Sequence, residues 1–287
     1  MMISYANGIH IPTEQLALPF VDDPIGTLRG YRIFTACRTV RGKVFRLDDH
    51  VNRLFDSAET MYMNMPHTRE EIFNIIQETV EKNKGHAEGD LLVEILLSGG
   101  SAGENGFSPK GNTHLYVIAL PLKMWPARFY RHGIALASYP YERQFASVKL
   151  LNYVGGVIAH QTVVKKHNAQ DALFVSVDKP HYVLEGTTFN FSVVKDGVIY
   201  THPFDGRILA GITLKVTLNL AHKSGITVQE ERLPYEVLKK ADESFITSST
   251  RNVLPVTRVD DMVIGTGVPG TITMRLMEGF GQYVASY

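Results

Sequence analysis

The chain has 287 residues, of which 44% are hydrophobic and 20% are charged. This length allows one large or two medium domains, and the composition is that of an ordinary globular protein. The 29 basic residues balance the 29 acidic ones. The chain therefore lacks the excess of positive charge that is typical of proteins that bind nucleic acids or anionic membranes.

Three further features bear on the cellular compartment. The one cysteine, Cys37, excludes an internal disulfide and favours a reducing compartment. Residues 1–12 lack the basic start and the apolar stretch of a signal peptide. No apolar run approaches the roughly 18 residues that span a bilayer. We therefore expect a cytoplasmic protein with no membrane or nucleic-acid partner.

The first third of the chain predicts a hairpin followed by two helices. Residues 31–47 alternate between apolar and polar side chains, with Arg41-Gly42 at the turn. Asp48 or Asp49 is expected to cap the first helix, which ends before Pro66. The second helix opens on a capping box and closes at a glycine, and its signature residues are Thr68, Glu71 and Gly85.

The rest of the chain predicts strands mixed with helices. Strands are expected at 91–97 and 114–120, on either side of a Gly-, Ser- and Asn-rich loop at 99–112. Further strands are expected at 134–139, 172–177, 191–194, 198–200 and 244–247, and helices near 153–167, 213–224 and 235–241. This mixture predicts an α/β or α+β fold.

The segment 121–131 divides the predicted elements into two groups. It holds two prolines and the only tryptophan, which suits an ordered connector better than a flexible linker. We therefore predict a first domain at 1–120, a connector at 121–131 and a second domain at 132–287.

Lys149 stands among apolar residues, since Val148 precedes it and Leu150 and Leu151 follow it. Desolvation lowers the pKa of an ammonium group, and that makes a lysine nucleophilic toward an aldehyde. The alternative is a lysine at the end of a strand with its charged head in water.

Glu185 follows the short apolar run Tyr182-Val183-Leu184. A carboxylate at the end of a strand can keep a heteroaromatic nitrogen protonated, which is the partner that an electron-sink cofactor needs. The alternative is a glutamate in a surface turn.

Several residues could together hold a phosphate. Gly211-Ile212-Thr213 opens a helical pattern, and the N–H groups at a helix N-terminus attract anions. An ordinary threonine cap explains the same pattern. Further candidates are the hydroxyls of Ser248, Ser249 and Thr250 and the guanidinium of Arg53, although a turn and a surface ion pair would also explain them. The combined set suits a phosphorylated pyridine aldehyde.

In these residues the chain resembles the class-IV (fold-type IV) aminotransferases, which use pyridoxal 5′-phosphate (PLP). That family includes branched-chain and D-amino-acid aminotransferases and aminodeoxychorismate lyase. The resemblance runs from about Tyr31 to Phe280 and rests on ordered blocks. These are His50 to Leu54, Lys149 to Tyr153, Leu184 to Gly186, Asn190-Phe191, Tyr200 to Pro203, Leu209 to Thr213 and Ala241 to Thr250.

The resemblance implies a role for each candidate residue. Lys149 would be the Schiff-base lysine and proton shuttle, Glu185 would pair with the pyridine nitrogen, and Tyr153 would lie near the phenolic oxygen. The phosphate would be held by Arg53, Gly211, Ile212, Thr213, Ser248 and Ser249. No metal ligand is expected.

The resemblance also implies a fold, an assembly and a reaction. The fold would be a small N-terminal α/β domain and a larger C-terminal domain with a barrel-like sheet, and the chain would form a homodimer. The reaction would move an amino group between an amino acid and a 2-oxo acid in two half-reactions, with Lys149 as general base.

The substrate is less well defined by the sequence. Asn152-Tyr153 resembles the branched-chain enzymes, and residues 101–107 lack the Arg-x-His of D-amino-acid enzymes. The pattern Phe34-Thr35-x-x-Arg38 resembles the lyase, and Thr35 replaces an acidic residue of the branched-chain enzymes. Leu214 stands where an arginine is common. We expect branched-chain substrates, with D-amino-acid transfer and pyruvate elimination as alternatives. Candidate substrate-binding residues are Arg32, Phe34, Arg38 and Thr250.

Overall fold

The computed structural model describes residues 1–86 and 88–287, which form two compact units, each with its own hydrophobic core. The first unit comprises Met1–Lys123, Val148–Asn152 and Tyr287, and the second comprises Met124–Ser147 and Tyr153–Ser286. The sequence assigned 148–152 to the second domain. In the structure this segment packs with the first unit, because Leu150 pairs with a strand there.

The first unit is built on a six-stranded sheet in the order β2-β1-β8-β5-β3-β4. The strands are β1 (Ile3–Ala6), β2 (Ile9–Pro12), β3 (Arg32–Val40), β4 (Lys43–Val44), β5 (Leu91–Ser98) and β8 (His114–Pro121). The predicted hairpin is confirmed as β3 and β4. Its turn residues Arg41 and Gly42 both have positive φ, as a two-residue hairpin turn requires.

The helices of the first unit are α1 (Pro24–Arg29), α2 (Leu47–Thr60) and α3 (Arg69–Lys82). The predicted cap of α2 is wrong, because the helix begins at Leu47 and Asp48 and Asp49 lie in its first turn. Their negative charges there interact favourably with the helix dipole. The capping box of α3 is confirmed, since Thr68 and Glu71 bond each other's backbone N–H groups.

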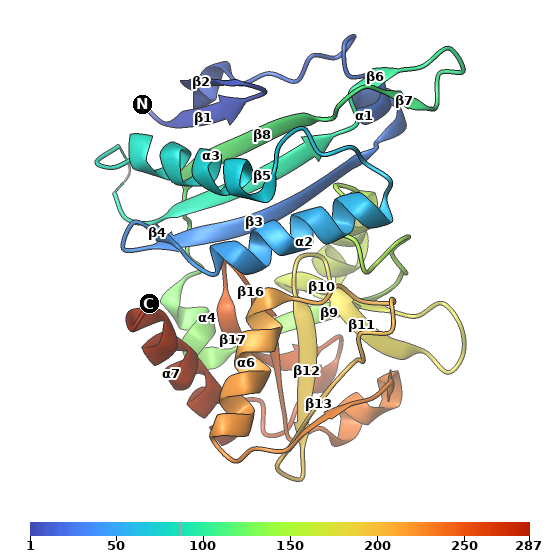
Figure 1. The fold of residues 1–287 in the computed structure, drawn as a ribbon. Helices are drawn as coiled ribbons and strands as arrows, with labels where there is room; N and C mark the ends of the chain where they lie inside the picture. The colour runs from blue at the N-terminus through green and yellow to red at the C-terminus, as the bar shows by residue number, and fades with distance from the viewer. Residues whose placement is uncertain (87) are drawn as a thin grey trace. The chain divides into compact units, whose positions relative to one another are not determined.

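Figure 1 shows α2 and α3 along one face of this sheet. That face is apolar because alternate residues of β3 and β5, among them Ile33, Cys37, Val93 and Ile95, pack against both helices. The residues between them, including Phe34, Ala36 and Glu94, therefore lie on the opposite face of the sheet. Two short strands, β6 (Ser101–Ala102) and β7 (Pro109–Lys110), pair within the predicted loop at 99–112.

The second unit contains a closed ring of six strands. The ring runs β12-β16-β17-β9-β10-β11 and closes where Glu185 of β11 pairs with Asn190 of β12. Its strands are β9 (Ile134–Pro140), β10 (Asp171–Val175), β11 (Tyr182–Gly186), β12 (Asn190–Lys195), β16 (Glu243–Ser248) and β17 (Asn252–Val259). The predicted barrel-like sheet is therefore confirmed. The outer strands are β13 (Val198–Thr201), β14 (Val228–Glu230), β15 (Leu233–Pro234) and β18 (Met262–Val263).

Helices α4 (Ala127–His132), α5 (Val154–Ala159), α6 (Ile212–Lys223) and α7 (Thr271–Ala285) complete the second unit. Short 3₁₀ turns at Thr13–Gln15, in the first unit, and Tyr235–Lys240, in the second, and a π-helical turn at His160–Val164 account for the remaining helical residues. The sequence did not predict α7 or β17. None of the helices in the described part of the chain has the length and apolar character needed to cross a bilayer.

Candidate active site

Lys149 lies at the outer edge of the first unit's sheet. The segment that carries it pairs antiparallel with β3, since the N–H of Phe34 donates to the carbonyl of Lys149 at 2.9 Å and the N–H of Leu151 donates to Arg32 at 3.0 Å. The side chain is half-buried, and its Nζ lies 4.6 Å from the centre of the Phe34 ring. The predicted extended and partly apolar setting of this lysine is therefore present.

Arg53 belongs to a buried polar cluster between α2 and β3. Its Nη2 donates to Oγ1 of Thr35 at 2.6 Å and lies 3.4 Å from Nδ1 of His50. Thr35 Oγ1 in turn lies 2.9 Å from His50 Nδ1. Since an arginine can only donate, the neutral imidazole accepts through Nδ1.

Electrostatics favour an anion beside this cluster. Burial lowers the pKa of His50 well below its usual value, and the positive charges of Arg53 and Lys149 lower it further. His50 therefore stays neutral and adds no positive charge of its own beside Arg53 and Lys149. The sequence did not assign a role to His50, although it stands three residues before Arg53, on the same face of the helix.

The two arginines predicted to bind a substrate carboxylate already have contacts in the first unit. Arg32 donates through Nε to Ser98 Oγ at 2.9 Å, and its Nη2 lies 3.5 Å from a carboxylate oxygen of the buried Asp23. The guanidinium of Arg38 is buried and lies 5.9 Å from the ring centre of Phe45. Their role toward a substrate stays a prediction.

Glu185 is buried at the end of β11, only 5% exposed, so it does not lie in a surface turn. Its Oε1 accepts from Arg143 Nε at 3.0 Å, and its Oε2 accepts from the N–H of Leu209 at 3.0 Å. Two donors to one buried carboxylate favour its charged form.

Arg143 is a site residue that the sequence reasoning missed. Besides Glu185, it donates to the carbonyls of Gly186 and Thr187, and its guanidinium lies 5.0 Å from the ring centre of Tyr153. The structure thus brings Arg143, Tyr153 and Glu185 together. The sequence feature that could have identified Arg143 is its position as a charged residue just after the apolar strand β9.

Gly211 lies directly against the side chain of Asn190. A Cβ atom at this position would be 1.9 Å from Oδ1 of Asn190. Asn190 also donates through Nδ2 to the carbonyl of Leu209 at 2.8 Å and pairs in the barrel with Glu185 and Thr247. One asparagine therefore joins the carboxylate, the start of α6 and the end of β16.

The start of α6 and the end of β16 have the properties of a phosphate cradle. No side chain of the described residues caps α6, whose first residues are Ile212 and Thr213. The first N–H groups of a helix have no intrahelical partner and attract anions. At the end of β16, the buried hydroxyls of Thr247 and Ser248 have no hydrogen-bond partner among the described residues. These groups fit the phosphate of PLP, and the paired Glu185 fits its pyridine nitrogen.

Ser249 and Thr250, the other two predicted hydroxyls, lie half-buried in the turn that joins β16 to β17. Within the described residues, no group of three or more His, Cys, Asp or Glu side chains is arranged to hold a metal ion.

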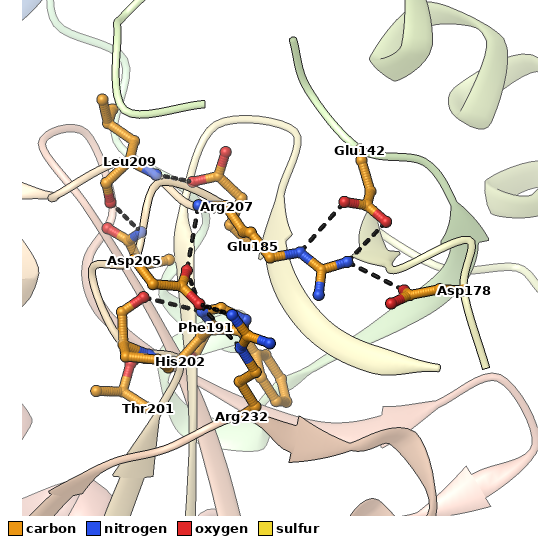
Figure 2. Close-up of polar contacts among 12 residues, drawn as sticks. Glu142, Asp178, Glu185, Phe191, Thr201, His202, Asp205, Arg207, Leu209 and Arg232 are labelled. Atoms are coloured by element: carbon orange, nitrogen blue, oxygen red, sulfur yellow. Dashed lines mark hydrogen bonds and ion pairs between the residues drawn. The ribbon is translucent and has the colours of Figure 1, made fainter. Parts of the chain in front are cut away.

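Ion pairs brace the loop between β13 and α6, which supplies Leu209 (Figure 2). Arg207 binds Glu142 at 2.8 Å and Asp178 at 3.0 Å, and Asp205 accepts from Arg232 at 2.8 Å. His202, beside Asp205, is buried, and this burial lowers its pKa. The bracing holds the Leu209 N–H against Glu185, as Figure 2 shows.

The chain is similar in sequence to proteins named as aminotransferases. A Methanocaldococcus jannaschii protein, provisionally named branched-chain-amino-acid aminotransferase, is 33% identical over 96% of this chain and 94% of its own length. D-alanine aminotransferase from Staphylococcus epidermidis is 30% identical over 99% and 98%.

Solved structures show the same fold. The T.th. branched-chain amino acid aminotransferase complexed with N-(5′-phosphopyridoxyl)-L-glutamate has a TM-score of 0.87 and 29% identity, covering 99% of this chain and 94% of its own. The Escherichia coli branched-chain enzyme has a TM-score of 0.88 and 26% identity, covering 98% and 94%. Residues 32–259 match the family described as amino-transferase class IV. The chain therefore belongs to the class IV aminotransferases.

Proposed function

We propose that the chain is a PLP-dependent aminotransferase of branched-chain type. The observation that carries the proposal is the buried Glu185, which accepts hydrogen bonds from Arg143 and from the N–H of Leu209. PLP is the cofactor of class IV aminotransferases, and it acts as an electron sink when its ring nitrogen is protonated beside such a carboxylate.

Each remaining site residue has a proposed part. Lys149 binds the cofactor aldehyde and then moves the substrate α-proton as general base. Arg53, Ile212, Thr213 and the hydroxyls of Ser248 and Ser249 hold the phosphate, and Gly211 leaves the space for it. Tyr153 would contact the phenolic oxygen of the cofactor. Arg32, Phe34, Arg38 and Thr250 stay candidates for substrate contacts.

The branched-chain assignment is supported by the solved relatives and by the apolar Phe34 beside Lys149. D-alanine transfer is the second candidate, because proteins of that name are also 30% identical. It is disfavoured by the absence of an Arg-x-His pair in residues 101–107.

The test begins with the visible absorption of protein-bound PLP. The purified wild type is expected to show it, and Lys149→Ala to lose it. Donors such as L-leucine, D-alanine and D-glutamate are then mixed with the enzyme, since a productive donor bleaches the band. A wild type that binds no PLP would contradict the proposal, and bleaching by D-alanine alone would select the second candidate.

We also propose a homodimer. Helix α5 exposes three apolar side chains, Val154, Val157 and Ile158, the first of them 67% exposed. Exposed apolar residues at helical spacing are typical of protein interfaces. Light scattering coupled to size exclusion is expected to give twice the chain mass, and Val157→Asp to shift it toward the monomer.

We propose a cytoplasmic location because the chain has a single cysteine. Cys37 is buried, and burial raises the pKa of its thiol to about 12, so it stays a reduced thiol. Fractionation of cells that express the native protein would test this location.

A further inference from the structure

The turn between β16 and β17 carries the hydroxyls proposed to hold the phosphate, and it ends on Arg251, which has no part in the proposed function. The N–H of Arg251 donates to the carbonyl of Ser248 at 3.3 Å. Ser249 and Thr250 are therefore the two central residues of a β-turn, with Ser248 and Arg251 at its ends. A contact that fixes Arg251 also fixes the direction in which the hydroxyls of this turn point.

The side chain of Arg251 is buried between one carboxylate and two aromatic rings. Its Nη2 donates to Oδ2 of the buried Asp171 at 2.9 Å. The centre of its guanidinium lies 4.4 Å from the ring centre of Trp125 and 5.4 Å from that of Phe189. Its Nε and Nη1 make no hydrogen bond within the described residues. Stacking on the two rings therefore holds the part of the guanidinium that Asp171 does not bind.

Asp171 can anchor this arginine because its own position is fixed. Its Oδ1 accepts from the hydroxyl of Thr187 at 2.6 Å and lies 3.1 Å from Nε2 of His160. Burial raises the pKa of the Asp171 carboxyl, but the hydrogen bonds of His160 and Thr187 and the charge of Arg251 lower it overall. The carboxyl is therefore charged at neutral pH and forms a buried ion pair with Arg251.

The Phe189 ring joins Arg251 to the segment that carries Glu185. A Cβ atom on Gly186 would be 1.9 Å from the Phe189 ring, so this ring lies directly against the Gly186 backbone. Gly186 follows Glu185 in the chain, and its carbonyl accepts from Arg143. The ring under the guanidinium is thus held by the backbone beside the carboxylate that is proposed to pair with the pyridine nitrogen.

Two residues from the predicted connector 121–131 fix Arg251 from the other direction. Trp125 supplies the nearer of the two rings, and the hydroxyl of Tyr130 donates to the carbonyl of Arg251 at 3.1 Å. Trp125 itself packs against Phe129, with the ring centres 5.3 Å apart. Both the side chain and the backbone of Arg251 are therefore anchored within the second unit.

We propose that Arg251 is a positioning residue for the phosphate of the cofactor. Held by Asp171 and by the two rings, it keeps the turn in the conformation in which the hydroxyls of Ser248 and Ser249 bind the phosphate. Arg251 acts through the turn and does not need to contact the cofactor. The inference rests on the proposed function, because it requires PLP at this turn.

A comparison of PLP with pyridoxal, which lacks the phosphate, tests this role. Both dissociation constants are measured by titration of the full chain, and the ratio of the pyridoxal constant to the PLP constant gives the contribution of the phosphate to affinity. Arg251→Met removes the charge and the planar group, and we expect the ratio to fall about tenfold. Arg251→Lys keeps the charge beside Asp171 but cannot stack as a plane, and we expect the ratio to fall about threefold.

Arg258→Met is the matched control, because Arg258 is a half-buried arginine near the other end of β17. It donates there to the carbonyls of His167 and Asp260. The ratio in this variant should equal that of the wild type. An equal fall of the ratio in Arg258→Met would show that the effect is not specific to Arg251, and would overturn the inference.

A purely structural role of Arg251 would weaken both ligands alike. An Arg251→Met protein that folds and has the wild-type ratio, even with both constants raised, would therefore overturn the inference. If Arg251→Met does not fold, Arg251→Lys decides by the same criterion. A wild type that binds no PLP would contradict the proposed function as well. An unchanged ratio in a protein that binds PLP would contradict the inference alone.

Discussion

Arg53 on α2 donates a hydrogen bond of 2.6 Å to the hydroxyl of Thr35 on β3. In Thr35→Val the shape of the side chain is kept, but Arg53 loses this acceptor and His50 loses its hydroxyl partner. The loss of a buried hydrogen bond with a charged donor costs about 1–3 kcal/mol. We expect the dissociation constant of PLP to rise about tenfold, as measured by titrating the apoenzyme with the cofactor.

Thr39→Val is the control, since Thr39 lies on the same strand and face and bonds Asp90 and the N–H of Leu91 instead. It should lower stability by a similar amount and leave PLP affinity unchanged. Equal PLP affinity in Thr35→Val and wild type would show that Thr35 does not position Arg53.

Thr35 and Arg53 also show which features of the site could be predicted from the sequence. The blocks around Arg53, Lys149 and Glu185 identified the family because each is a local signature. The presence of Thr35 in place of an acidic residue could be read from the sequence. Its contact with Arg53 could not, because that contact depends on how α2 packs across β3.

Local signals likewise predicted some elements and not others. The capping box at Thr68 fixes the start of α3 from four residues. In contrast, α7 contains Gly279 and Gly281, which disfavour a helix, and β17 contains Pro255, which disfavours a strand. Packing in the second unit overrides these preferences. Arg143 was missed because its partner Glu185 is 42 residues away.

Arg143→Met tests the support of Glu185. The change keeps the length of the side chain but leaves a buried carboxylate without its cation, which costs about 3–5 kcal/mol. We expect unfolding at lower urea concentration and kcat/KM reduced about a hundredfold. The control is Arg275→Met, which removes an exposed arginine whose one hydrogen bond within the described residues goes to the carbonyl of Ser224. If Arg143→Met and the control have the same kcat/KM, Arg143 has no role in holding Glu185.

Gly211→Ala tests the phosphate cradle. The φ of Gly211 is −67°, which alanine adopts freely, so the cost comes from the overlap of Cβ with Asn190. We expect α6 to be displaced at its start and PLP affinity to fall at least tenfold in a cofactor titration. Gly279→Ala, in α7 with open space around it, should instead raise stability by about 0.5–1 kcal/mol and leave affinity unchanged. If Gly211→Ala binds PLP as tightly as the wild type, the start of α6 does not hold the phosphate.

His50 makes stability depend on pH. Its pKa in the folded protein lies well below the ordinary 6.5, because it is buried beside Arg53 and Lys149. Below pH 6.5 the unfolded chain therefore binds a proton at this residue that the folded chain does not, and stability falls as the pH falls. The expected slope is about 1.4 kcal/mol per pH unit, and above the unfolded pKa the effect vanishes. The free energy of unfolding of the wild type minus that of His50→Gln, from urea titrations at pH values on both sides of 6.5, should be constant at high pH and decrease at low pH. A difference that is the same at every pH would mean that the pKa of His50 does not change on folding, and the neutral state of His50 beside Arg53 would be contradicted.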